Sequence, residues 1–589
     1  MTGYRPPLDD IDFTLNHIVD LPAIAKLDGF QHADPETVRG LLEEAGRFFS
    51  EVIAPLNVIG DRQGSRLTEQ GNVQTPDGFK NAYAKFVEAG WGGAHVDEEW
   101  GGGGLPYTVG IVLQEMFKGA NMAFSLAPLL TQAGIEALSE HGSAQQQQTY
   151  LLKLVSGEWT GTMCLTEPQA GSDVGALTTR AEPQADGSYR LFGQKIFITW
   201  GEHDLTENII HLVLARTPDS PPGTKGISLF VVPKFLPDQG GKPGIRNDLR
   251  VVSLEHKLGI HASPTCVLSF GDAGDGAVGF LVGEERAGMR YMFTMMNTAR
   301  LAVGVEGLAI SESAYQHARD FAAVRRQGRA LGSTAPEPSP IIEHPDVVRM
   351  LMTMKSYTEA MRALLYTAAQ GVDRARHAET AQERERAEEL VALLTPIGKA
   401  WCTDLGVEIA SLGIQVHGGM GFIEETGAAQ YYRDARIAPI YEGTNGIQAI
   451  DLVTRKITAS QGAMVMDLLS EMESTAASAP EALSDLARPL TTAVTALRTA
   501  TRHLLGALSD NPNQALAGAS PYLRMFGTVL GGWFHLRSAI AATALLATGG
   551  HEQFLQGRIG LARFYCRQLL PQAEALLPAA TAPLSDLAM

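Results

Sequence analysis

A block of short, β-branched segments at residues 160–282 lies between two long helical stretches, and this order constrains the fold more than any other feature. Examples are YRLFGQKIFIT, IIHLVLAR and GISLFVVP, each bounded by turn residues. Runs rich in Val, Ile and Phe between turn residues are typical of strands, and Asp186-Gly187 is typical of a hairpin turn. Strands grouped between helices predict an α+β fold and exclude an alternating parallel α/β sheet.

The flanking stretches have a helical period. Residues 36–53 place Val38, Leu42 and Phe49 on one face, and Asp34 and Pro35 suit the start of that helix. Further helical patterns cover 288–325, 344–378, 381–412 and 445–459. We therefore divide the chain into an N-terminal extension (1–35), an N-terminal helical domain (36–158), a central antiparallel β domain (159–284), a helical bundle (285–460) and a C-terminal helical extension (461–589).

Composition excludes several classes of protein. The 589 residues are 45% hydrophobic and 19% charged, which is a globular balance and not that of a disordered chain. The net charge of −18 disfavours non-specific binding to nucleic acid. The N-terminus lacks the apolar core of a signal peptide, and His535 and Arg537 interrupt the most apolar stretch, 526–550, so we expect a buried helix there and no membrane span. The four cysteines are far apart, which predicts reduced thiols in a cytoplasmic protein and no metal site.

Two motifs in the β block could hold a cofactor. The lone G-x-G-x-x-G at 274–279 is followed by a strand-like run, so we interpret it as a turn and not as a dinucleotide fingerprint. The segment 163–173, MCLTEPQAGSD, combines hydroxyls with a glycine that allows close backbone approach, which suits a flat polar ring or a pyrophosphate. By itself it would equally fit a structural turn. Phe197 and Thr199 share one face of a later strand.

Two further motifs lie in the helical bundle. The segment 415–422, QVHGGMGF, has three glycines that could bring the main chain close to a ligand. In the segment 440–448, IYEGTNGIQ, Glu442 stands between an aromatic residue and a glycine, just before a predicted helix. A carboxylate beside an apolar wall has a raised proton affinity and can act as a general base. A lone glutamate here would also fit a surface position or a helix N-terminus.

In this order and spacing, the motifs resemble those of the flavin-dependent acyl-CoA dehydrogenase family. The resemblance runs from about residue 36 to 459, and the remaining N-terminal and C-terminal segments resemble a longer bacterial branch of the family. It implies a helical N-domain, a central β domain, a four-helix bundle with FAD between the last two, and an extra C-terminal helical domain. It also implies that the enzyme removes hydrogen from the α and β carbons of an acyl-CoA and passes electrons to an electron-transfer flavoprotein.

The resemblance also assigns site residues. Glu442 would remove the α-proton, and the Gly443 N–H would bind the thioester carbonyl. The FAD contacts would be Met163, Leu165 and Thr166 at the flavin edge, Gly171 and Ser172 near the phosphates, Phe197 packed on the flavin, Thr199 near flavin N5, Arg325 reaching the FAD of a neighbouring subunit, Gln415, Gly418 and Gly419 at the adenosine end, and Thr444 and Asn445. The substrate contacts would be Ser172, Asn297, Arg300 and Gly443.

Three questions stay open at this point. A minority of the family places the base just before the arginine that Arg300 matches, but here that residue is Ala299, which strengthens the assignment to Glu442. An acyl-CoA oxidase of the same fold, or a non-catalytic relative associated with DNA, are the alternative functions. An FAD site completed by Arg325 of a second subunit implies a homodimer or a tetramer.

Overall fold

The computed structural model describes residues 3–588 and divides into two compact units. Among the described residues, unit 1 comprises 3–46, 106–119 and 300–588, and unit 2 comprises 47–105 and 120–299. Each unit is therefore assembled from segments far apart in the sequence.

Unit 2 contains four helices and the main sheet. The helices are α4 (Leu56–Gln63), α5 (Phe79–Glu88), α7 (Met122–His141) and α8 (Ala144–Val155). Local capping explains where two of them begin. Asn121 accepts a hydrogen bond from the Phe124 N–H at 3.1 Å, and Ser143 forms a capping box with Gln146. Both caps satisfy backbone donors that the first helical turn leaves unpaired.

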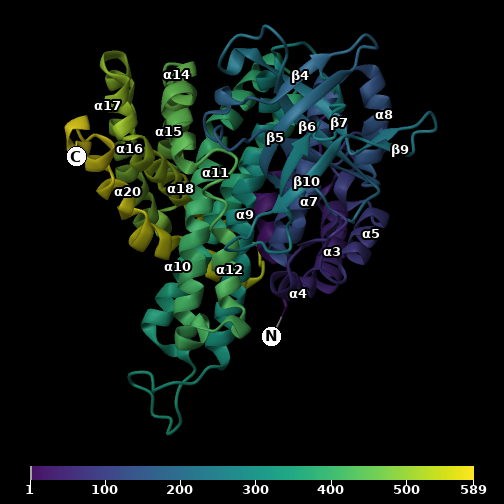
Figure 1. The fold of residues 1–589 in the computed structure, drawn as a ribbon. Helices are drawn as coiled ribbons and strands as arrows, with labels where there is room; N and C mark the ends of the chain where they lie inside the picture. The colour runs from purple at the N-terminus through teal and green to yellow at the C-terminus, as the bar shows by residue number, and fades with distance from the viewer. Residues whose placement is uncertain (1–2, 589) are drawn as a thin grey trace. The chain divides into compact units, whose positions relative to one another are not determined.

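The sheet of unit 2 follows helix α8. Its strands are β3 (Trp159–Cys164), β4 (Arg180–Pro183), β5 (Tyr189–Thr199), β6 (Asn208–Arg216), β7 (Ile227–Pro233), β10 (Leu249–Leu254), β11 (Thr265–Phe270) and β12 (Ala277–Leu281). The order is β10-β11-β5-β12-β7-β6-β3, and Figure 1 shows β6 beside β7. The pairs are antiparallel as predicted, except that β6 runs parallel to β3 and β4. Each parallel pair joins strands that are not consecutive in sequence, so the chain between them is long enough to return to the same end of the sheet before the second strand begins.

The turn between β11 and β12 contains the first two glycines of the G-x-G-x-x-G, and Gly279 lies in β12. Gly274 and Gly276 have φ values of +105° and +78°, which favour glycine. No helix follows, and β12 begins at Ala277. The interpretation of this motif as a turn is confirmed.

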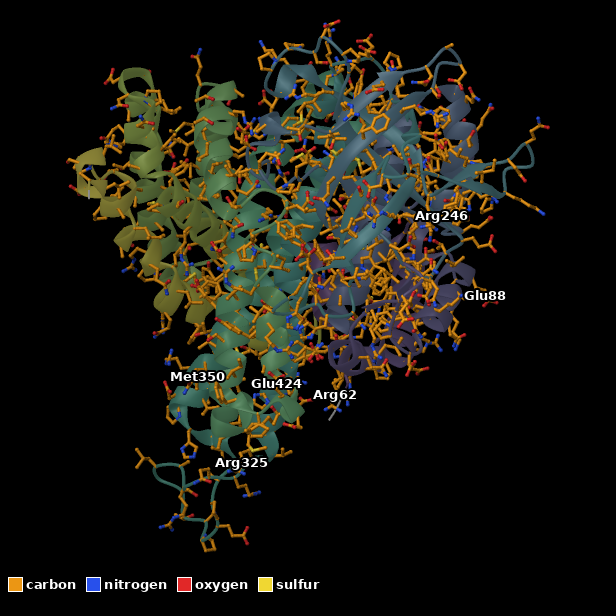
Figure 2. The ribbon with its side chains drawn as sticks, viewed as in Figure 1. Arg62, Glu88, Arg246, Arg325, Met350 and Glu424 are labelled. Atoms are coloured by element: carbon orange, nitrogen blue, oxygen red, sulfur yellow. The ribbon has the colours of Figure 1, made fainter. Side chains whose placement is uncertain are left out.

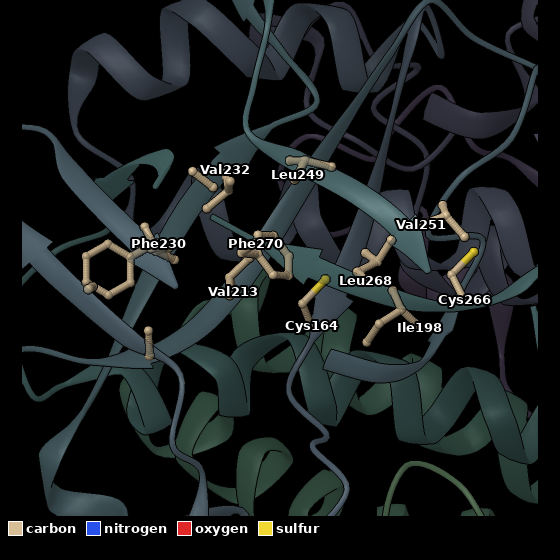
Figure 3. Close-up of a cluster of buried hydrophobic side chains, with 14 of the residues drawn as sticks. Cys164, Ile198, Val213, Phe230, Val232, Leu249, Val251, Cys266, Leu268 and Phe270 are labelled. Carbon is tan, nitrogen blue, oxygen red and sulfur yellow. The ribbon is translucent and has the colours of Figure 1, made fainter. Parts of the chain in front are cut away.

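The core of unit 2 packs around the sheet (Figure 3). Cys164, Val213, Phe230 and Phe270 are among its buried members. Burial raises the pKa of the Cys164 thiol to about 12, against the Thr162 hydroxyl and Lys195, so this cysteine stays protonated. All four cysteines are buried and free, as predicted.

Unit 1 contains the long helices of the bundle. Its helices include α1 (Leu8–His17), α3 (Pro35–Phe48), α6 (Tyr107–Ala120), α9 (Gly288–Val324), α10 (Pro345–His377), α11 (Ala381–His417) and α13 (Asn445–Asp451). The bounds agree with the helical patterns to within a few residues, with three exceptions. Helix α11 extends five residues further, and α3 and α13 give way to π-helical segments at Phe49–Ile53 and Leu452–Lys456. Asp34 accepts hydrogen bonds from the Glu36 and Thr37 N–H groups and caps α3, as predicted.

The C-terminal extension packs on the bundle within unit 1. It contains α15 (Ala463–Ala477), α16 (Ser484–Asp510), α18 (Ala519–Ala547) and α19 (Glu552–Phe564), and α18 lies against α10, α11 and α16 (Figure 1). Gly527 allows a close approach, since a Cβ there would lie 2.3 Å from the Trp401 ring. Two helical stretches, Ala381–Phe422 and Ala519–Ala547, are long and apolar enough to cross a membrane, but 72% and 61% of their apolar windows are buried. The expectation of a buried helix near 526–550 is confirmed.

A buried ion cluster joins five helices of unit 1. Arg362 of α10 lies 2.7 Å from Glu115 of α6, 2.9 Å from Glu312 of α9 and 2.5 Å from Glu359. Arg558 of α19 contacts Glu359 and, at 3.1 Å, an aspartate of α1. Since every charge has an opposite partner, the cluster avoids the high cost of an unpaired buried ion. It fixes α19, and with it the extension, to the bundle.

Candidate active site

The buried side chain of Glu167 stabilises the loop after β3. Its carboxylate accepts hydrogen bonds from Lys195 at 2.8 Å and from the N–H and hydroxyl groups of Thr178 and Thr179 at 2.6–3.0 Å. Lys195 also donates to the Leu165 carbonyl at 3.0 Å. Burial alone would raise the pKa of Glu167, but Lys195 and these donors lower it to about 2. The loop is therefore built on a buried Glu167–Lys195 ion pair.

The opposite side of the same loop is open. Gly171 and Ser172 are exposed, Leu165 and Thr166 are half-buried, and Met163 is buried at the end of β3. A Cβ added at Gly171 would meet nothing within 4 Å, so the backbone there is accessible to a ligand. We call these five residues, together with Phe197 and Thr199, the loop group.

A bulge in β5 turns Phe197 outward. Cys266 of β11 pairs with Ile198 and Leu268 pairs with Lys195, so β5 has one extra residue between those pairs. Phe197 takes up the irregularity with φ of +59° and leaves its side chain 57% exposed, while Ile198 is buried. A left-handed φ at a bulky residue costs about 1–2 kcal/mol, and such strain is often found at ligand sites.

The segment that carries Glu442 is fixed by its neighbours in unit 1. The Thr444 hydroxyl accepts a hydrogen bond from the Ile447 N–H at 3.2 Å and caps α13. The Asn445 side chain donates to Asp404 at 2.7 Å and accepts from Lys399 at 2.8 Å, which ties the start of α13 to α11. Because that side chain is engaged with α11, a cofactor contact by Asn445 would come from its backbone.

Glu442 lies in a charged and strained setting. Its φ is +55°, a left-handed value that is uncommon outside glycine. Burial raises the pKa of its carboxyl group, whereas Arg300 and Lys399 act against the rise. Burial lowers the pKa of Lys399 itself to about 8, and Arg300 is paired with Asp451 at 3.4 Å. A carboxyl group with raised proton affinity beside two cations suits a general base.

Gly443 follows Glu442 in a second left-handed conformation, with φ of +80°. Gln448 of α13 donates to the carbonyls of Glu442 and Gly443, at 3.2 Å each. Within residues 3–588 the Gly443 N–H has no hydrogen-bond acceptor. A Cβ at Gly443 would lie 2.8 Å from the Gln448 amide nitrogen and 3.7 Å from the Arg300 guanidinium, so a larger residue would crowd the site. We call Arg300, Glu442, Gly443, Thr444 and Asn445 the base group.

The remaining predicted residues lie elsewhere. Arg325, Gln415, Gly418 and Gly419 are exposed at one end of the bundle, where Phe321 of α9 stacks on His417 of α11 with ring centres 4.4 Å apart. Figure 2 shows Arg325 where the 327–340 loop projects from the bundle. Asn297 is exposed on α9, three residues before Arg300. The structure thus groups the predicted residues into the loop group, the base group and this bundle-end group.

Two of these groups have features that suit parts of an FAD molecule. The loop group offers an exposed aromatic ring, hydroxyls and open backbone, which suit a flat ring and its phosphates. The bundle-end group offers an exposed guanidinium and two glycines at which a Cβ would meet nothing within 4 Å. Across residues 3–588 no cluster of three or more His, Cys, Asp or Glu side chains could hold a metal ion.

Sequence reasoning missed the groups that support the site. Glu167 and Lys195 anchor the loop group, and Glu306, Tyr441 and Lys399 surround the base group. The available signal was a charged residue inside an otherwise apolar run, as in LAVGVEGLAI for Glu306 and QKIFIT for Lys195. Their partners could not be identified, because those partners are 28 to 135 residues away in sequence.

Comparisons with known proteins place the whole chain in one group of enzymes. Sequence families match in order: the acyl-CoA dehydrogenase N-terminal domain (35–158), middle domain (162–273) and C-terminal domain (286–457), and an acetyl-CoA dehydrogenase C-terminal-like domain (468–588). The 3-methylmercaptopropionyl-CoA dehydrogenase of Ruegeria pomeroyi is 48% identical over 97% of each chain.

Two solved structures share the fold. ACDH-11 of Caenorhabditis elegans, in complex with C11-CoA, has a TM-score of 0.78 at 20% identity and covers 97% of this chain and 92% of its own. An acyl-CoA dehydrogenase of Bacillus anthracis, in complex with FAD, has a TM-score of 0.73 at 21% identity and covers 97% and 91%. At these identities the likeness concerns the fold alone.

Proposed function

The chain belongs to the acyl-CoA dehydrogenase family and is an FAD-dependent oxidoreductase, and we propose that Glu442 is the base that starts its reaction. The observation that supports this role is the setting of Glu442: a partly buried carboxyl group, on strained left-handed backbone, next to an N–H group that has no acceptor among the described residues. The alternatives of an oxidase and of a DNA-associated relative have no comparable observation in their favour.

The base group would act on the thioester in two ways. Glu442 takes the proton from the α carbon, and the Gly443 N–H donates a hydrogen bond to the thioester carbonyl as negative charge builds on its oxygen. A donor placed in this way typically contributes about 3–4 kcal/mol to the transition state. Arg300 adds positive charge to the same region. When bound, FAD supplies the acceptor for the hydride of the β carbon.

The loop group and bundle-end group would hold the cofactor. Phe197 would pack on the flavin ring, with Thr199, Thr166, Leu165 and Met163 along it. Gly171 and Ser172 would approach the phosphates, and Ser172 and Asn297 the acyl-CoA. Gln415, Gly418 and Gly419 would bind the adenosine end. Thr444 and Asn445 would contact the flavin from the base group.

We propose a short acyl-CoA that carries a thioether as the substrate. The support is the 48% identity, over nearly the full length, to an enzyme named for 3-methylmercaptopropionyl-CoA. One methylene group changes discrimination by only about 1–3 kcal/mol, so related linear acyl-CoAs of similar length should react more slowly and not be excluded. Electrons would pass to an electron-transfer flavoprotein in the cytoplasm.

We also propose that two copies of the chain associate through the bundle end. Val324 and Phe422 are 75% and 85% exposed there, and Met420 and Ile423 are close to half exposed. Exposed apolar side chains of this size on neighbouring elements favour a protein interface. In that assembly Arg325 would reach the FAD of the second copy. The test is the mass in solution, which should fall toward that of the 63.1 kDa monomer in a Phe422→Glu variant.

The deciding experiment is an anaerobic visible spectrum with added acyl-CoA. The wild type should lose its flavin absorbance with 3-methylmercaptopropionyl-CoA, and more slowly with butyryl-CoA. Glu442→Gln should bind FAD yet reduce it at least 1000-fold more slowly, consistent with the loss of a general base and its positioning. Glu425→Gln, at an exposed glutamate of the same unit, is the matched control and should react like the wild type. Rapid reduction in Glu442→Gln would disprove the role of Glu442.

A further inference from the structure

A second carboxyl group is buried next to the segment that carries Glu442. Glu306 of α9 is fully buried, and one of its oxygens accepts a hydrogen bond from the Tyr441 hydroxyl at 2.5 Å. The other oxygen has no hydrogen-bond partner within residues 3–588. An unpartnered buried carboxylate oxygen is costly, so its presence calls for a reason other than stability.

The groups around Glu306 come from three other elements of unit 1. Lys118 of α6 and Lys399 of α11 are the nearby cations, and Tyr441 and Glu442 face it from the loop before α13. Lys118 donates to Gln114 and Lys399 donates to Asn445, so neither lysine makes a direct ion pair with Glu306. The cations therefore act on Glu306 through the electric field and not through a hydrogen bond.

The sequence link between the two carboxyl groups is short. Tyr441, whose hydroxyl donates a hydrogen bond to Glu306, is the residue directly before Glu442. Glu442 has left-handed backbone, which persists only where the surroundings hold it in place. The Tyr441–Glu306 hydrogen bond holds one end of this strained pair, and Gln448 holds the other through the two carbonyls.

We propose that Glu306 is a positioning residue for the general base: it fixes the segment of Glu442 through the Tyr441 hydroxyl, and its negative charge opposes ionisation of the Glu442 carboxyl group. The proposal rests on Glu442 as the base. A like charge at short range in a poorly hydrated site makes a carboxylate a stronger base. Lys118, Lys399 and Arg300 counter this effect, so the strength of the base is set by a balance of buried charges.

The charge of Glu306 also responds to pH. Burial raises the pKa of Glu306 to about 7, and Glu442 adds to the rise, while Lys118, the Tyr441 hydroxyl and Lys399 act against it. Near neutral pH, protonation of Glu306 therefore removes one negative charge from beside the base. The acid side of the rate profile should consequently report two carboxyl groups and not one.

The charge is tested with Glu306→Gln, which keeps an oxygen to accept from Tyr441. We measure the rate of flavin reduction by saturating 3-methylmercaptopropionyl-CoA from pH 5 to 9. The acid midpoint should move down by about one pH unit relative to the wild type, because a nearby negative charge is gone. Asp373→Asn removes another buried carboxylate of unit 1, which caps α6 through the Tyr107 and Thr108 N–H groups, and should leave the midpoint unchanged. A superimposable Glu306→Gln profile, or an equal shift in Asp373→Asn, would overturn the proposal.

The positioning is tested with Tyr441→Phe, which also serves if Glu306→Gln does not fold. The rate of reduction should fall about tenfold while KM stays within about twofold, as expected when an interaction that matters only in the transition state is lost. Tyr522→Phe, which breaks a buried hydrogen bond to Thr501 in the C-terminal extension, is the control and should react like the wild type. An unchanged rate in Tyr441→Phe would also overturn the proposal. If Glu442→Gln itself stays active, the role of Glu442 fails first, and the two failures are thereby distinguished.

Discussion

The anchor of the loop group gives the sharpest stability prediction. In Lys195→Met the Glu167 carboxylate stays buried but loses its ion-pair partner. The drop in the pKa of Glu167 from 4.5 to about 2 corresponds to about 3 kcal/mol of preference for the ionised form. Breaking a buried ion pair by removing one partner typically costs about 3–5 kcal/mol. We therefore expect unit 2 to lose about 3 kcal/mol of its free energy of unfolding.

The assay is thermal and urea unfolding with the bound FAD measured in parallel. For a unit of this size, a loss of about 3 kcal/mol lowers Tm by roughly 6–12 °C. FAD should dissociate more readily, because the Leu165 carbonyl also loses its donor. Lys225→Met, at an exposed lysine of the same unit, should change Tm little. A loss below about 1 kcal/mol in Lys195→Met would refute the reasoning, since Thr178 and Thr179 alone would then suffice to hold Glu167.

Four further predictions concern other parts of the structure. Gly443→Ala should reduce flavin reduction by at least tenfold while the protein stays folded, because a Cβ would lie 2.8 Å from the Gln448 amide at a φ of +80°; stopped-flow reduction and Tm measure the two effects. Burial raises the pKa of Asp373 from 3.8 to about 6, although its three hydrogen bonds oppose the rise. The protonated carboxyl group therefore contributes about 3 kcal/mol to the free energy of unfolding below pH 3.8, and this contribution is lost as pH rises to 6. Asp373→Asn should lack this pH dependence in urea unfolding at different pH values. Arg558→Met should lower the free energy of unfolding by about 3 kcal/mol, because Glu359 loses a buried partner, and the fall in Tm measures this loss. A chain that ends at residue 460 should aggregate, because α18 no longer covers Trp401, and light scattering detects the aggregates.

The sequence predicted the elements better than their assembly. The helical period located both ends of α9 and α10 and the start of α11, and Asp34 was identified as a cap, because these signals are local. The parallel pairing of β3 with β6 was not predicted, since it depends on which strand edges remain unpaired after the antiparallel strands have formed. The bulge at Phe197 was not predicted either, because it depends on the register of β5 with β11.

The same difference between local and long-range signals applies to the candidate site. Glu442 and Gly443, which are adjacent in sequence, lie near Arg300 in the structure. The buried groups that tune them did not emerge, because an acidic residue in an apolar run indicates only that some partner exists. Glu306 finds its hydrogen-bond partner 135 residues later, and no local pattern encodes that distance.

The grouping of α6 with the bundle has a consequence during synthesis. Glu115 of α6 is completed early, but its partner Arg362 lies 247 residues further along the chain. At about 5–20 residues per second, the ribosome needs roughly 12–50 s to supply that partner. During this interval α6 carries one acidic and one basic side chain, Glu115 and Lys118, which are both buried away from water in the folded protein. Helix α6 should therefore stay undocked on the nascent chain while the strands of unit 2 are made, and its docking should be a late step of folding.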